Sequence, residues 1–161
     1  MDNSIELTLK IILDAWKGQV SRVDKLLSEL ADEQFGNEVS PGSNTGVYLL
    51  GNLAAVHDAL FPLLGVGEKL YRELENIFIK NQDKSGLEQS PVKELRIYWQ
   101  EVNSKLLDYF GRFSPEEWLQ KHTAVNEEAF KEEPHRNRLN VLVSRTNHLA
   151  YHFGQLAFLK K

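Results

Sequence analysis

The chain has 161 residues, a length that fits one domain and allows roughly 70 % of the unfolded surface to be buried without a stabilising cross-link. With 42 % hydrophobic and 26 % charged residues, the composition is that of an ordinary globular protein. The chain contains no cysteine, which excludes disulfides, thiolate metal ligands and a cysteine nucleophile within it.

The charge and the hydropathy of the chain argue against nucleic acid and membranes as binding partners. The formal net charge is −4 and the isoelectric point is near 5.7, whereas binding to nucleic acid usually requires a basic face. No apolar run approaches the roughly 18 residues of a membrane span, and the start MDNSIELTLK lacks the features of a signal peptide. We therefore expect one cytoplasmic domain over residues 1–161 that binds neither nucleic acid nor membrane.

The first half of the chain predicts two long helices. Over residues 4–30 apolar side chains recur every three to five residues, and charged side chains lie between them. The predicted buried stripe is Leu7, Ile11, Trp16, Val20, Val23, Leu27 and Leu30. Residues 35–45, rich in glycine and asparagine, predict a connection, and the apolar stretch 47–64 predicts a central helix with a kink or break at Pro62.

The middle of the chain predicts a further helix over residues 68–78 and a polar loop over 80–90. Ser90 and Pro91 are typical of an N-cap and a first helical position. The apolar stripe that follows them is Val92, Leu95, Trp99, Val102, Leu106 and Phe110.

Towards the C-terminus, Ser114 and Glu117 have the spacing of a capping box, which predicts a short helix carrying Trp118. A last long helix is expected over about 137–160. No strand pattern competes with these helices, so the sequence predicts an all-α four-helix bundle with one or two short additional helices.

The candidate chemistry lies in the histidines His57, His122, His135, His148 and His152. His148 and His152 are four residues apart, so on a helix they lie about 40° apart and one turn above the other, where both rings can bind one ion. They share an arc with apolar residues, which predicts that they point towards the core.

A third ligand must come from another helix. On the predicted central helix, His57 lies about 40° from Leu53 and within the apolar arc, which makes it the best candidate by angle. Asp58 lies further round and is either a carboxylate supporting a ligand or a solvated one. Three histidines leave an open position on the metal, as in catalytic sites.

Two short motifs resemble those of a known family. The stretch from His148 to Leu156, HLAYHFGQL, is similar to the last-helix signature of the DinB-like (damage-inducible, DinB/YfiT-type) superfamily, and residues 51–58, GNLAAVHD, resemble its second-helix motif. The resemblance implies a four-helix bundle with a divalent metal, usually nickel or zinc. It also implies transferase or isomerase chemistry that uses a low-molecular-weight thiol as cofactor.

The second-helix motif departs from that family at one position. Many relatives have a histidine that opens a His-Leu-Ala or His-Val-Ala triplet, and the matching triplet here begins with Asn52. Asn52 and His57 lie about 140° apart on a helix, so they cannot substitute for each other. The angular argument favours His57 as the third ligand, and the motif alignment favours position 52.

Arg145 is predicted on the inward side of the last helix, about 60° from His148. It is either a buried ion-pair partner or an anion-binding group for a substrate carboxylate. His122 is expected on the surface. His135 follows Glu132 at a spacing that resembles a di-iron ligand pair, but Pro134 interrupts the helix that such a pair needs.

These observations support two hypotheses. The first is a metal-dependent enzyme that acts on a small-molecule substrate, with His57, His148 and His152 as ligands and Arg145 as a substrate or anion contact. The second is a non-catalytic helical bundle that dimerises or binds a small ligand, with a weak or absent metal site. A homodimer is expected in either case only from the frequency of homo-oligomers.

Overall fold

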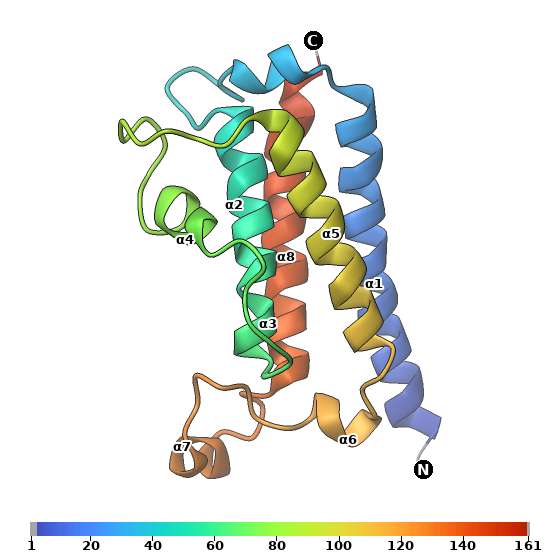
Figure 1. Ribbon diagram of the computed structural model, residues 1–161. Helices are drawn as coiled ribbons and strands as arrows, with labels where there is room; N and C mark the ends of the chain where they lie inside the picture. Colours follow the sequence, from blue (N-terminus) through green and yellow to red (C-terminus); the bar gives the residue numbers. More distant parts are fainter. Residues whose placement is uncertain (1–2, 161) are drawn as a thin grey trace.

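The protein is described here by a computed structural model that covers residues 3–160. Four long helices form a bundle (Figure 1): α1 (Asn3–Glu29), α2 (Gly46–Asp58), α5 (Val92–Phe110) and α8 (Arg138–Leu156). The connections carry the short helices α3 (Leu60–Leu63), α4 (Glu73–Phe78), α6 (Pro115–Trp118) and α7 (Glu127–Glu132), and the 3-10 turns η1 (Asp32–Gly36) and η2 (Ala157–Leu159). Within residues 3–160 no β-strand forms, so the predicted all-α bundle is confirmed, with four short α-helices in its connections instead of the one or two expected.

Pairs of parallel helices build the bundle. α1 and α8 run in one direction and α2 and α5 in the other, with α1 packed on α8 and α2 packed on α5 (Figure 1). α2 also contacts α4 and α8, so it is covered on several sides and almost entirely buried, as predicted for a central helix. The three tryptophans Trp16, Trp99 and Trp118 are all in the core.

The buried face of α1 differs from the predicted stripe in its first half. Trp16, Val20, Val23 and Leu27 are buried, but Leu7 and Ile11 are 59 % and 61 % exposed. The step of five residues from Ile11 to Trp16 turns the helix by about 140°, so the two residues lie on opposite faces. Leu9 takes the buried position in this part of α1 instead.

The central helix ends earlier than predicted. α2 stops at Asp58 and a turn at Ala59 separates it from α3, which contains Pro62. Pro62 has no N–H to donate to the carbonyl of Asp58, four residues before it, so the helix breaks on the N-terminal side of the proline.

The expectation that no apolar run reaches the length of a membrane span is wrong for Gly46–Leu63. These 18 residues are long and apolar enough to cross a membrane, and 61 % of the stretch is buried inside the bundle. The buried core helix of a globular protein passes the same test, so the stretch is weak support for a membrane span.

Two predicted helix starts are also shifted. Residues 68–72 lie outside α4, because the Asp58 carboxylate accepts hydrogen bonds from the backbone N–H groups of Leu70 and Tyr71 at 2.7 and 2.9 Å and holds this segment out of the helix. α5 begins after Pro91, which is itself the N-cap, so Ser90 lies one residue outside.

The capping box at α6 is confirmed. The Ser114 hydroxyl accepts from the Glu117 N–H at 3.2 Å, and the Glu117 carboxylate accepts from the Ser114 N–H at 2.7 Å. α8 begins where expected, with Asn137 as its N-cap.

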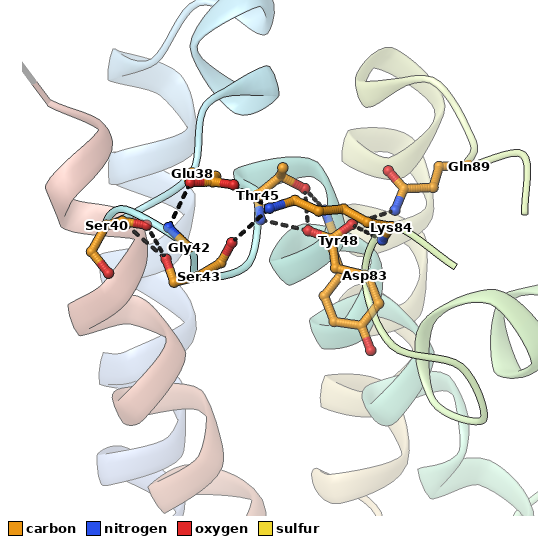
Figure 2. Close-up of polar contacts among 9 residues, drawn as sticks. All are labelled: Glu38, Ser40, Gly42, Ser43, Thr45, Tyr48, Asp83, Lys84 and Gln89. Atoms are coloured by element: carbon orange, nitrogen blue, oxygen red, sulfur yellow. Dashed lines mark hydrogen bonds and ion pairs between the residues drawn. The ribbon is translucent and has the colours of Figure 1, made fainter. Parts of the chain in front are cut away.

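The first turn of α2 is held by a hydrogen-bonded cluster (Figure 2). Asp83, in the loop after α4, accepts from the backbone N–H and the hydroxyl of Thr45 at 2.7 and 2.8 Å, and from the side-chain amide of Gln89 at 3.0 Å. Lys84 pairs with Glu38 in the connection between α1 and α2. The cluster ties two long loops to the start of the central helix and so fixes the position of the helix that carries His57.

Candidate metal centre

His148 and His152 form a close pair on α8. Their Nε2 atoms are 3.1 Å apart, and the two rings meet edge to face with their centroids 4.5 Å apart. The sequence predicted that both rings point into the core. Both residues are only half-buried, so the pair lies at the edge of the core. The predicted convergence of the two rings is present.

Hydrogen bonding fixes which nitrogen of His152 carries the hydrogen. Its Nδ1 lies 2.7 Å from the side-chain oxygen Oε1 of Gln155, and an oxygen can only accept, so Nδ1–H donates. In the neutral ring Nε2 then has a free lone pair. His148 donates its Nε2–H to that lone pair, which leaves its own Nδ1 buried and without a partner.

His57 is fully buried on α2, between two tryptophans. Its ring stacks on Trp16 with the centroids 5.9 Å apart and contacts Trp99 at 4.9 Å. Its Nδ1 is 2.7 Å from Oδ1 of Asn103, whose amide nitrogen donates to the carbonyl of Trp99. Nδ1–H is therefore the donor, and Nε2 carries a buried lone pair that has no partner.

Asn52 and His57 face different neighbours. The amide of Asn52 donates to the carbonyl of Phe78 at 2.7 Å, so this side chain is directed towards α4. His57 faces the bundle interior and lies close enough to α8 that its protonated form would lower the pKa of His148. The angular argument, rather than the motif alignment, describes the orientation of α2.

Asp58 does not support a metal ligand, nor is it solvated. It is 1 % exposed, and both of its carboxylate oxygens accept backbone hydrogen bonds from the segment before α4. Both predicted roles for Asp58 are wrong, because its two carboxylate oxygens are buried and bound to the backbone N–H groups of Leu70 and Tyr71, which follow it by 12 and 13 positions in the chain.

Burial keeps the three histidines neutral at physiological pH. It lowers the pKa of His57 to about 4, against the opposing effect of the Asn103 hydrogen bond. It also lowers the pKa of His148 to about 4, and repulsion by the Arg145 charge, and by His152 and His57 when they are protonated, acts in the same direction. The pKa of His152 is lowered by burial as well. Neutral imidazole is the form that binds a metal.

Arg145 lies next to these histidines, and its charge lowers the pKa of both His57 and His148. The side chain is half-buried, its Nε has no hydrogen-bond partner, and burial lowers its own pKa. Among the residues that the structure describes, none forms an ion pair with Arg145. The sequence left two roles open for Arg145, a buried ion-pair partner or an anion-binding group. The described residues form no such ion pair.

The donor atoms suit a divalent metal, but the structure does not gather a complete ligand set. Metal–nitrogen bonds of about 2.0–2.1 Å place two ligand nitrogens roughly 3 Å apart, which matches the distance between the Nε2 atoms of His148 and His152. To bind the metal, His148 would have to carry its hydrogen on Nδ1 instead of Nε2. Within residues 3–160, however, no three His, Asp or Glu side chains lie together closely enough to hold a metal ion. His57 would have to move towards the pair to become the third ligand.

Sequence reasoning missed Asn103 and the two tryptophans around His57. Asn103 is a polar residue within the otherwise apolar buried stripe of α5. A polar residue at such a position is the feature of the sequence that could have identified it. The other two histidines lie outside the pair: His135 is exposed, and His122, predicted on the surface, is half-buried.

Comparison of the chain with models of protein families and with curated protein sequences finds no match. The DinB-like resemblance therefore stays a prediction that rests on the two motifs quoted above.

Proposed function

We propose that this protein is a metal-dependent enzyme in which His57, His148 and His152 bind a divalent metal, nickel or zinc. The observation that carries the proposal is the 3.1 Å contact between the Nε2 atoms of His148 and His152, with Gln155 holding the hydrogen of His152 on Nδ1. Histidines that bind metals almost always donate their other ring N–H in this way.

The state of His57 supports its part in the proposal. Asn103 holds the ring with Nε2 deprotonated, and that nitrogen is buried without any protein partner. A buried acceptor left unpaired costs about 1–3 kcal/mol, so native proteins keep few of them. A metal bound to Nε2 would remove this cost.

The reaction that we propose is the one that the resemblance implies, transfer or isomerisation with a low-molecular-weight thiol. A metal with three histidine ligands and an open position binds a thiol as the thiolate and lowers its pKa. The protein's own residues hold the ligand rings: Gln155 orients His152, and Asn103 orients His57. Trp16 and Trp99 exclude water from His57.

Calorimetric titration of metal-free protein with zinc tests the proposal. We expect stoichiometric binding that His148→Ala weakens at least tenfold, because a direct ligand contributes more than the roughly 10–100-fold of a residue that only orients one. His135→Ala removes an exposed histidine and should leave the affinity unchanged. Equal zinc affinities in the wild type and in His148→Ala would contradict the proposal.

The exposed side of α8 favours the second candidate, a non-catalytic bundle that dimerises. The exposed residues of α8 and η2 carry no charge, and Tyr151 and Phe158 are 66 % and 68 % exposed. A twofold dimer brings identical patches together, so an uncharged patch avoids repulsion with a second copy. Failure of the wild type to bind zinc, combined with a dimeric mass in solution, would favour this candidate.

A further inference from the structure

Arg145 differs from the other half-buried arginines in having no partner. Arg96 donates to Asp32 and to two backbone carbonyls, Arg136 pairs with Glu133, and Arg138 donates to the Glu117 carbonyl and covers the Phe113 ring. In the described part of the chain, the buried Nε of Arg145 has no hydrogen-bond partner, and no ion pair includes the Arg145 side chain. A half-buried cation without a partner is costly to keep.

A second buried donor without a partner lies against His57, the histidine whose pKa is lowered by the charge of Arg145. The Trp16 indole stacks on His57, is fully buried, and its Nε1–H donates to no acceptor. Arg145 and Trp16 thus leave N–H donors unpaired around His57, while His57 itself leaves a lone pair unpaired. The lone pair suits a cation, and the two N–H groups suit an acceptor-rich anion.

We propose that Arg145 binds the carboxylate of a small ligand beside the histidines, so that the molecules this site accepts are carboxylates. A guanidinium donates two parallel hydrogen bonds to a carboxylate, a geometry that a neutral amide does not reproduce. Arg145, His148 and His152 lie within an arc of about 60° on α8, so one short ligand can reach both the cation and the pair. The coordination of this ligand to a metal rests on the proposed function, whereas its contact with Arg145 does not.

The test uses the full chain loaded with zinc and two matched probes, mercaptoacetate and its neutral amide, mercaptoacetamide. We expect the wild type to bind mercaptoacetate at least tenfold more tightly in calorimetric titrations. Arg145→Gln should abolish this preference without weakening zinc binding, because the Arg145 charge opposes a cation at the histidines. Arg22→Gln, which removes an exposed arginine from α1, should retain the preference for mercaptoacetate. Equal binding of the two probes by the wild type, or a preference that survives Arg145→Gln, would overturn the inference.

Metal-free protein separates this inference from the proposed function. Acetate should shift the Arg145 Nε–H resonance in a saturable way in ¹⁵N-labelled protein, and acetamide should not. If zinc fails to bind but acetate gives this shift, the proposed function is wrong and the carboxylate site stands. If acetate produces no saturable shift, the carboxylate site is wrong, whatever zinc does.

Discussion

At the scale of single residues, the question is which side chain of α2 completes the metal site. His57→Gln should weaken zinc binding at least tenfold, because it removes the buried Nε2 lone pair. Asn52→His should change the affinity little, since position 52 faces Phe78 and α4. Calorimetric titration of both variants measures the two effects. The opposite order, tighter binding by Asn52→His and no loss in His57→Gln, would mean that α2 is rotated.

Gln155 offers a second test at this scale, because it touches His152 and would not touch the metal. Gln155→Leu removes the acceptor that holds the hydrogen on Nδ1 of His152. We expect zinc affinity to fall about 10–100-fold while the thermal midpoint changes little, since the residue is only half-buried. An unchanged affinity would show that Gln155 does not orient the ring.

At the scale of elements, the cluster around Asp83 should determine how firmly α2 is seated. Burial acts to raise the pKa of Asp83, but its hydrogen bonds to Thr45 and Gln89 outweigh burial, so the pKa is lowered. Asp83→Ala should reduce the free energy of unfolding by about 1–3 kcal/mol, because the part-buried donors of Thr45 and Gln89 lose their acceptor. Urea denaturation measures the loss. Asp108→Ala, which removes only an exposed pair with Arg112, should cost far less.

The elements that could be predicted from sequence are those set by local chemistry. The capping box at Ser114 and the N-terminal start of α8 involve residues three apart, and a single sequence displays such spacings. The break before Pro62 was misplaced only because the proline acts on the carbonyl four residues earlier.

Contacts between elements were not predictable in the same way. Asn103 meets His57 across 46 residues of chain, and Asp58 meets Leu70 across a loop. Neither spacing belongs to a helical period, so no pattern displays it. Leu7 and Ile11 were assigned to the core although they are exposed. The apolar spacing alone does not show that the first residues of the stripe lie on a different face of the helix from the rest.

At the scale of the whole molecule, the buried histidines couple stability to pH. The pKa of His57 is about 4 in the folded protein, against about 6.5 in an unfolded chain. Between these values the unfolded state binds more protons, so the stabilisation by neutral His57 is present above pH 6.5 and is lost as the pH falls towards 4.

This coupling can be measured with metal-free protein. The free energy of unfolding should fall between pH 6.5 and 4.5, and the slope should be steeper in the wild type than in His57→Gln by up to about 1.4 kcal/mol per pH unit. Carboxylates titrate in both proteins, so their contribution cancels in the comparison. Parallel slopes would show that His57 is not buried in the neutral form.

The most direct test of the central claim, that the three histidines bind a metal, is elemental analysis of protein purified without chelator. We predict about one nickel or zinc ion per chain in the wild type and in His135→Ala, and far less than one in His148→Ala. A wild type that stays free of metal after dialysis against both ions would contradict the claim, as would full metal content in His148→Ala.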